Sequence, residues 1–277
     1  MTANEDYVHG YSPRERERLA DQADTLAHLL HSDTFYSSGS LVLEAGCGVG
    51  AQTVTLAKRS PGATIVAMDI SAASLNAAKA TVRSAGYTNV VFQQSDMYSM
   101  AFAPETFDHV FACFVMEHLP RPREALAHLA RVLKPGGTIT VIEGDHGSAY
   151  FHPESVHARA AIQCLIDLQA RAGGDSLIGR RLYPLLLDSD FSDVSVSPRM
   201  VYVDSSQPQL VEGFTRNTFT AMVEGVRERA LAEKLIDEET WEKGISDLYR
   251  TAERDGTFCY AFFKAVARRQ LDGAGRQ

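Results

Sequence analysis

Three glycines at alternate positions follow an acidic residue, and this stretch is the part of the chain best suited to bind a ligand. An apolar run ends at Glu44, then come Gly46, Gly48 and Gly50, and a helix-forming stretch begins at Ala51. Glycine leaves the backbone bare and free to turn, and a helix start offers N–H groups that lack partners inside the helix. We therefore predict a buried strand, a tight turn and a helix N-terminus that together bind a carboxylate or a phosphate.

The glycine spacing alone leaves the class of ligand open. The dinucleotide fingerprint G-x-G-x-x-G requires a glycine at the position occupied by Ala51, and an acid two residues before the first glycine is not part of it. A nucleotide-binding oxidoreductase and a purely structural turn stay as alternatives at this point.

Acidic residues also end the strands that follow. Asp69 ends the apolar run over 64–68, and Asp96 follows the run that begins at Val90. A carboxylate at the end of the second strand can accept hydrogen bonds from both hydroxyls of a ribose. The alternative for Asp69 is an N-cap of the helix that we expect over 72–85. A nucleoside next to the glycine turn fits both acids.

The motifs, taken in order, resemble those of class I S-adenosylmethionine (SAM) methyltransferases over roughly residues 40–145. The matching pieces are Glu44-x-Gly46-x-Gly48-x-Gly50, the strand acids Asp69 and Asp96, the triplet Glu117-His118-Leu119 after a strand over 107–114, and Leu133-Lys134-Pro135-Gly136-Gly137 before a strand over 138–142. The chain is similar in particular to the small-molecule branch that includes ubiquinone and menaquinone biosynthetic enzymes. The segment 7–19 resembles a narrower branch, the tailoring methyltransferases of secondary metabolism.

The resemblance implies that SAM lies along the glycine turn and leaves as S-adenosylhomocysteine. Glu44 would neutralise the amino group, Asp69 would bind the ribose, and Asp96 would accept from the adenine amino group. For Arg18 the alternative is a helix ion pair with Glu15 or Asp21. The implied cofactor residues are Tyr7, Arg18, Glu44, Gly46, Cys47, Gly48, Gln52, Thr53, Asp69, Ile70, Ser95, Asp96, Met97, Cys113 and Phe114.

The residues that would act on the acceptor are less clearly marked. A sulfonium has a neutral leaving group, so alignment supplies most of the acceleration, and a base is required only if the acceptor must lose a proton. The candidate bases are His118, His146 and His9, with a structural or site-lining role as the alternative for His118. The expected acceptor-lining residues are Tyr11, Val115, His118, Asp145, His146, Phe151, Phe214 and Phe219. Core packing is the alternative for the last two.

The alternation of apolar strands and helices predicts an α/β fold. The resemblance specifies a Rossmann-like seven-stranded sheet, parallel with an antiparallel C-terminal strand, flanked by helices and carrying helical lid insertions. We expect helices over 148–175 and 177–187, a strand over 194–203, helical structure over 208–254 and a strand over 257–267. The expected parts are an N-terminal lid helix (1–35), a SAM-binding core (36–147), a lid helix (148–176), more core (177–204), a helical lid insertion (205–255), a final core strand (256–270) and a tail (271–277).

The composition of the chain limits which kinds of partner we expect it to bind. The 277 residues carry a net charge of −8, which disfavours nucleic acid and anionic membranes. No apolar run is long enough to span a bilayer, and the four cysteines lack metal-ligand or C-x-x-C spacing, so no metal is expected.

We therefore expect a cytoplasmic monomer or homodimer that methylates a small, largely apolar or aromatic molecule at oxygen, nitrogen or carbon. An indole alkaloid or a cyclic dipeptide is the acceptor that the resemblance suggests. The alternatives are methylation of RNA or protein, and nucleotide or SAM binding without methyl transfer.

Overall fold

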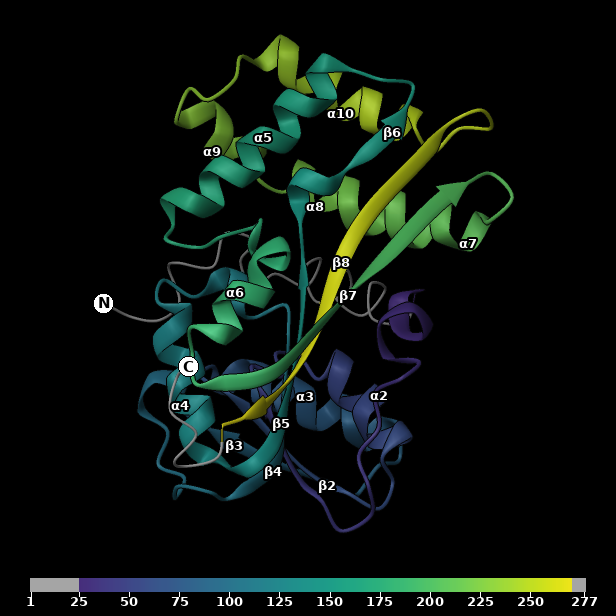
Figure 1. Ribbon diagram of the computed structural model, residues 1–277. Coiled ribbons are helices and arrows are strands. Elements are labelled where there is room, and N and C mark those ends of the chain that lie inside the picture. Colours follow the sequence, from purple (N-terminus) through teal and green to yellow (C-terminus); the bar gives the residue numbers. More distant parts are fainter. Residues whose placement is uncertain (1–24, 271–277) are drawn as a thin grey trace. The chain divides into compact units, whose positions relative to one another are not determined.

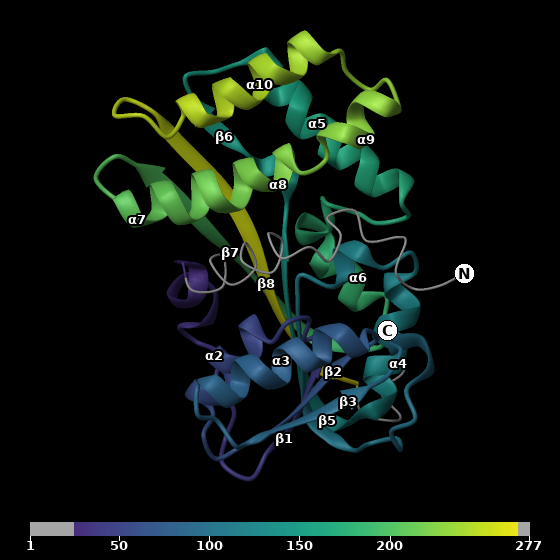
Figure 2. The same cartoon turned by 180° about the vertical axis from the view of Figure 1, so that it is seen from behind.

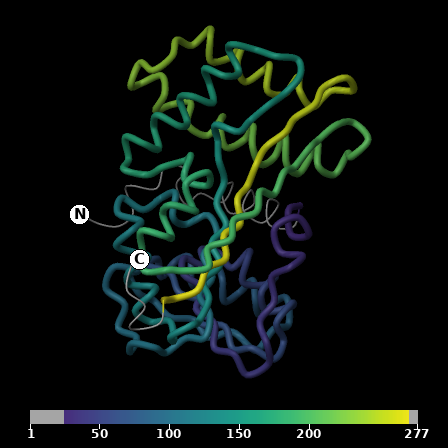
Figure 3. The backbone as a smooth tube through the Cα atoms, in the orientation of Figure 1, coloured from purple at the N-terminus to yellow at the C-terminus, as the bar shows by residue number. Residues whose placement is uncertain are grey.

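The computed structural model describes residues 25–270, which divide into two compact units (Figure 1). Of the described residues, unit 1 holds 25–29, 144–177 and 199–262, and unit 2 holds 30–143, 178–198 and 263–270. Three strands have residues in both units: β5 (Leu133–Gly144), β7 (Phe191–Asp204) and β8 (Thr257–Arg269). The tube in Figure 3 follows this path, with β8 as its yellow segment.

The strands form one sheet in the order β3-β2-β1-β4-β5-β8-β6, with β7 paired to β8. β1 (Leu41–Ala45), β2 (Thr64–Asp69), β3 (Val90–Gln94) and β4 (Phe107–Cys113) run parallel, and β5 runs parallel to β4. The chain order reverses at β1, which has β2 on one side and β4 on the other. In an open α/β sheet, ligands bind outside the carboxyl ends of the strands at such a reversal.

The predicted α/β class is confirmed, but the strand count of seven is wrong. The sheet has eight strands because β6 (Tyr150–His152) pairs antiparallel with β8, with Phe151 opposite Phe258. This strand falls inside the helix that we predicted over 148–175. That helix, α5 (Val156–Arg171), begins later, at the N-cap Ser155, whose hydroxyl accepts from the Ala158 N–H at 3.1 Å.

In unit 2, helices pack on both faces of the parallel strands. Figures 1 and 2 show α2 (Ala51–Arg59) beside α3 (Ala72–Ser84), and α4 (Pro122–Val132) beside α6 (Leu182–Leu187). Successive strand residues point to opposite faces. On β2, Ala67 packs with Leu75 and Ala78 of α3, whereas Met68 joins the cluster that contains Leu126 of α4. Because Ala67 and Met68 are consecutive on β2, α3 and α4 lie on opposite faces of the sheet.

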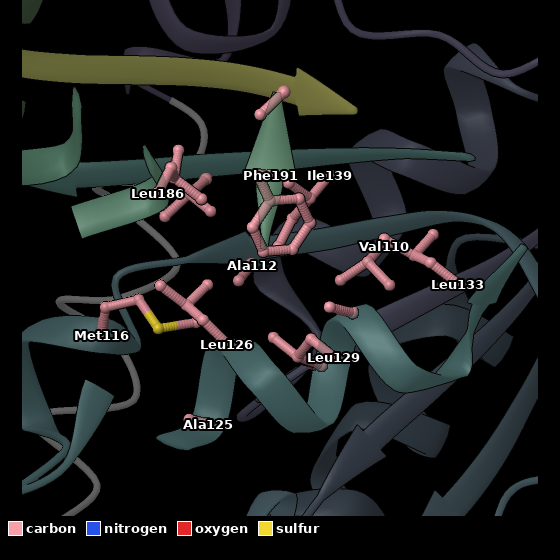
Figure 4. Packing of buried hydrophobic residues seen from close by; sticks show 14 of the residues in the cluster. Val110, Ala112, Met116, Ala125, Leu126, Leu129, Leu133, Ile139, Leu186 and Phe191 are labelled. Carbon is pink, nitrogen blue, oxygen red and sulfur yellow. The ribbon is translucent and has the colours of Figure 1, made fainter. Parts of the chain in front are cut away.

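The larger of these clusters is the main core of unit 2 (Figure 4). Leu126 and Leu129 lie three residues apart on α4 and form its apolar face. They pack with Val110 of β4 and Phe191 of β7, all of which are buried. The predicted helix over 177–187 is divided into a 3₁₀ turn, Ile178–Arg181, and α6.

Unit 1 is mainly helical within the described ranges. It contains α5, α7 (Pro208–Leu210), a π-helix (Val211–Thr220), α8 (Ala221–Glu224), α9 (Arg227–Ala232) and α10 (Glu238–Arg250). The α5 and α10 helices lie side by side in Figure 1. The helical stretch predicted over 208–254 is therefore several short helices, and β7 and β8 extend beyond the predicted strands at 194–203 and 257–267. No helix in the described part of the chain is both long and apolar enough to cross a bilayer.

Candidate functional site

The glycine turn of unit 2 presents bare backbone at the end of β1. Gly46, Gly48 and Gly50 have φ values of 79°, 52° and 84°, which residues other than glycine rarely adopt. A Cβ on Gly50 would lie 2.9 Å from Cα of Ala78, so this glycine lets α2 approach α3. A Cβ on Gly48 would meet nothing within 4 Å. The space beside residue 48 is therefore open, as a ligand resting on the turn requires.

The N-terminus of α2 adjoins this open space. Its N-cap is Gly50, no side chain caps it, and its first turn contains no acidic residue. The first N–H groups of a helix have no partner inside the helix, and the helix dipole favours an anion there. A carboxylate or a phosphate therefore fits this end of α2.

Glu44 places a buried carboxyl group next to the turn. Its side chain is 2% exposed, and Oε2 has no hydrogen-bond partner among the described residues; the same holds for the hydroxyl of Thr53. Burial raises the pKa of Glu44 to about 7; the nearby Thr53 hydroxyl opposes the rise and the Asp69 charge adds to it. A buried acceptor without a partner is costly. A cationic donor, such as an ammonium group, would satisfy it.

Asp69 holds the glycine turn in place. One carboxylate oxygen accepts from the Gly48 N–H at 2.8 Å, and the other accepts from the Ser71 N–H at 2.9 Å. Burial raises the pKa of Asp69, and the N–H groups of Ser71 and Gly48 oppose that rise. The N-cap of α3 is Ser71, whose hydroxyl accepts from the Ser74 N–H, so the N-cap alternative for Asp69 is wrong.

The end of β3 lies next to that of β2. The Ser95 N–H donates to the Asp69 carbonyl at 3.1 Å, and the Asp96 carboxylate accepts from the Tyr98 N–H at 2.9 Å. Met97 is buried, whereas Ile70, which follows β2, is 44% exposed. The structure therefore brings together the residues predicted to bind the ribose and the adenine.

The end of β4 is held by an acid that the sequence analysis missed. Phe114 has a φ of 58°, and Glu143 Oε1 accepts from the N–H groups of Val115 at 3.0 Å and Met116 at 2.7 Å. Glu143 is fully buried, and burial, followed by the charge of Glu117, raises its pKa well above the usual range. It ends a strand as Glu44 and Asp69 do, and that signal could have identified it. Cys113, which precedes Phe114, is a free thiol whose pKa burial also raises.

Two of the three candidate bases, His118 and His146, lie in the described range, and they belong to different units. His118 of unit 2 has its Nε2 3.6 Å from Glu117 Oε1, and its side chain is 24% exposed. His146 of unit 1 is buried, and its Nδ1 lies 2.8 Å from the Tyr260 hydroxyl. Of these two candidates, His118 is the more exposed. The predictions for Tyr7, His9, Tyr11 and Arg18 lie outside the described residues.

The predicted acceptor aromatics of unit 1 pack against one another. Phe214 and Phe219 are each 1% exposed, and the Phe219 ring lies 4.7 Å from that of Phe258 and 5.5 Å from that of Tyr260. Phe151 stacks parallel to Phe258 at 6.2 Å. For Phe214 and Phe219 this is the core packing given as their alternative. For all three rings a role toward an acceptor stays a prediction.

Asp145, the remaining unit 1 residue predicted to line the site of the methyl acceptor, forms a hydrogen bond within its own loop. It is 2% exposed and accepts from the Gly147 N–H at 3.1 Å. Within the described ranges, no group of three or more histidine, cysteine or acidic side chains is arranged to hold a metal ion.

Comparison with known proteins identifies the family of the core. Residues 43–141 match the family model described as a methyltransferase domain. Methyltransferase GfsG of Streptomyces halstedii is 32% identical over 144 residues, which cover 52% of this chain and 51% of the relative. The chain thus spans about half the length of this curated relative. It spans 57% of a second relative, an uncharacterized 37.1 kDa protein encoded in a transposon of Streptomyces fradiae.

Two solved structures share the fold. A geranyl diphosphate methyltransferase in complex with SAM superposes with a TM-score of 0.53 at 17% identity, covering 90% of this chain and 85% of the other. The [4+2]-cyclase SpnF superposes with a TM-score of 0.55 at 17% identity, covering 91% and 81%. These likenesses show a shared fold. Residues 43–141 match the methyltransferase domain model, as the sequence motifs indicated, with SAM as the cofactor.

The residues present at the glycine turn fit SAM. The unpartnered Oε2 of Glu44 suits an ammonium group, and the uncapped start of α2 suits a carboxylate. The Glu44 carboxylate would repel a pyrophosphate, because both groups are negatively charged. The open space at Gly48 accommodates the chain between the two charged ends.

Proposed function

We propose that this protein transfers the methyl group of SAM to a small, largely apolar or aromatic acceptor. The observation that carries the proposal is the buried, unpartnered carboxyl oxygen of Glu44 beside an uncapped helix start. That pair complements an α-amino acid, which carries both an ammonium and a carboxylate group. When bound, SAM supplies an electrophilic methyl group on a sulfonium.

In this proposal each strand end of unit 2 binds one part of the cofactor. The residues from Glu44 to Thr53 hold its amino acid, including Cys47 and Gln52, and Asp69 holds the ribose. The adenine lies among Ile70, Ser95, Asp96 and Met97. The backbone at Cys113 and Phe114 contacts the amino group from the other side. The support is that these residues follow adjacent strands at the reversal of the sheet.

The protein's task toward the acceptor is mainly to align it and to exclude water. His118 is the residue that we propose to line the acceptor site and to accept a proton where the acceptor must lose one. The acceptor class rests on the resemblance to tailoring enzymes, and the relative GfsG, a methyltransferase, supports methyl transfer itself. An indole alkaloid or a cyclic dipeptide is our first choice, and the net charge of −8 disfavours RNA.

The test is incubation with SAM labelled in its methyl group and a library of aromatic alkaloids, cyclic dipeptides and phenols, read by mass spectrometry. We expect the label in one acceptor class and S-adenosylhomocysteine as the second product. Because the same fold serves a [4+2]-cyclase, transfer of the label is decisive. A product that forms without the label, or SAM binding without any transfer, would contradict the proposal.

A further inference from the structure

A buried histidine contacts the first turn of α2. The Nε2 atom of His31 lies 2.7 Å from Oε1 of Gln52, and His31 is 1% exposed. An amide oxygen only accepts hydrogen bonds, so Nε2 must carry the hydrogen. Burial lowers the pKa of His31 to about 4, which keeps the ring neutral at pH 7 and makes Nδ1 a bare acceptor. Nδ1 has no partner among the described residues.

The segment that carries this ring is anchored to the rest of unit 2. Arg59 donates to the carbonyl groups of Ser32 at 2.5 Å and Thr34 at 2.9 Å. The buried Lys264 ammonium lies 2.6 Å from both the Asp33 carboxylate and the Thr34 hydroxyl. These contacts involve the three residues that follow His31. They fix the backbone from which the ring reaches Gln52.

An apolar side chain would fill the same space at lower cost. The His31 ring packs against Phe111, with centroids 5.7 Å apart. Its buried Nδ1 has lost its hydrogen bonds to water and has no partner among the described residues to replace them. A leucine there would have no unpartnered polar atom. The bond to Gln52 is therefore the feature that the histidine supplies and a leucine would not.

Gln52 occupies the second position of α2, where the helix leaves its first N–H groups unpaired. With Oε1 engaged by His31, the amide N–H₂ group is the end of the side chain that stays available, and it makes no hydrogen bond within residues 25–270. Two more donors thus accompany the N–H groups of the helix start. Both sets are suited to an anion and not to a cation.

We propose that His31 is a positioning residue: it fixes the Gln52 amide with its N–H₂ group toward the carboxylate of the bound amino-acid nucleoside. The inference rests on the proposed function, because it takes SAM as the ligand of the turn. It goes beyond that function by assigning a role to a residue 21 positions before Gln52. It also states which part of the ligand depends on that residue.

The test is calorimetric titration with SAM and with decarboxylated SAM, which keeps the ammonium and lacks only the carboxylate. His31→Leu and Gln52→Leu should each weaken SAM about tenfold relative to wild type, while the dissociation constant of decarboxylated SAM stays unchanged. The double variant should bind SAM no more weakly than either single one, because both lose the same interaction. His31→Gln should restore most of the affinity, since its amide N–H₂ can donate to Gln52.

His109→Leu is the matched control. This half-buried ring lies in the same unit, with Nδ1 2.7 Å from the Thr138 hydroxyl, and has no contact with Gln52, so SAM affinity should not change. An equal loss for both ligands in His31→Leu, or no loss for either, would overturn the inference while wild-type binding of SAM upheld the proposed function. Absence of SAM binding by the wild type would overturn both. If His31→Leu does not fold, Gln52→Leu and His31→Gln carry the same comparison.

Discussion

The strand ends of unit 2 and the aromatic rings of unit 1 differ in what surrounds their buried side chains, although unit 1 also has unpartnered buried hydroxyls, on Thr215 and Thr220, within the described residues. At the ends of β1 and β5, Glu44 and Glu143 each keep one buried carboxyl oxygen without a partner among the described residues. In unit 1, the Phe214 and Phe219 rings are enclosed by three aromatic side chains of β8. These are Phe258, Tyr260 and Phe262, with ring centroids 4.7–6.1 Å from one or both.

This difference shows which kind of signal indicates a site. Unpartnered buried polar atoms reduce stability, so their presence beside an open turn points to a ligand. The aromatic rings of unit 1 pack against one another, and this packing explains their burial without a ligand.

Phe219→Ala should cause the largest change in stability. Removing a fully buried phenylalanine costs about 3–5 kcal/mol, through lost burial and the cavity that remains. We expect a loss of that size in the free energy of unfolding in urea, with SAM affinity of the folded variant unchanged. Phe219→Leu, which keeps most of the volume, should lose less than about 1.5 kcal/mol. Unaltered stability with a raised KM for the acceptor would instead place the ring in the acceptor site.

Glu44→Gln should stabilise the protein while weakening SAM. The pKa of Glu44 rises from 4.5 in the unfolded chain to about 7 in the folded one. The folded state therefore keeps a proton that the unfolded state releases between these values. Wild-type stability falls as pH rises from 4.5 to 7, and the full cost, on the order of 3 kcal/mol, persists above pH 7.

The glutamine carries no charge, so Glu44→Gln should gain about 1–3 kcal/mol at pH 8 and little at pH 4. Wild-type SAM affinity should fall as pH drops below about 7, because protonation removes the charge that pairs with the ammonium group. The variant should show weak binding with no such dependence. Urea unfolding and calorimetry at pH 4, 6 and 8 would measure both, and a pH-independent affinity in the wild type would remove Glu44 from the amino-group role.

Asp69→Ala should weaken SAM by at least tenfold, about 1.4 kcal/mol. The variant loses the predicted ribose acceptor and the bond that holds the Gly48 N–H at 2.8 Å. Ser71→Ala is the control, because it removes only the cap of α3 and should cost about 1 kcal/mol of stability without affecting SAM. Unchanged affinity in Asp69→Ala would reject the ribose role.

His118→Ala should have the smallest effect, a reduced kcat with SAM binding intact. A residue that lines the site contributes alignment, whereas a general base contributes about 100-fold or more. We expect a loss well below 100-fold in steady-state turnover. The exposed His28→Ala is the control. A loss above 100-fold that follows the titration of a single group would make His118 the base, and wild-type turnover would remove it from the site.

The fold of unit 2 and the turn that it presents are local properties, and the sequence predicted them. The β2 strand is a short apolar run that ends at Asp69, β1 carries Glu44 next to its last residue, and the turn needs residues that tolerate positive φ at 46, 48 and 50. Asp69 and Asp96 lie at the ends of β2 and β3, as expected from the same pattern. Such signals require no knowledge of distant contacts.

The features that the sequence did not reveal depend on pairing between distant segments. The β6 strand has three residues with only Phe151 buried, too short for an alternating pattern, and it exists because β8 lies opposite. The bond between His31 and Gln52 joins residues 21 positions apart. The Glu143 carboxylate reaches a turn 27 residues earlier in the chain. The β6 strand and the bond between His31 and Gln52 have no local pattern of their own. Glu143 does end a strand, but the groups that it contacts depend on the folded arrangement.

A crystal structure with S-adenosylhomocysteine tests the central claim most directly. We expect the ligand along the turn from Gly46 to Gly50, its ammonium group within hydrogen-bond distance of Glu44 Oε2 and its ribose hydroxyls on Asp69. Density for a diphosphate beside Gly48 when NAD is supplied, together with an empty turn in crystals grown with S-adenosylhomocysteine, would contradict it.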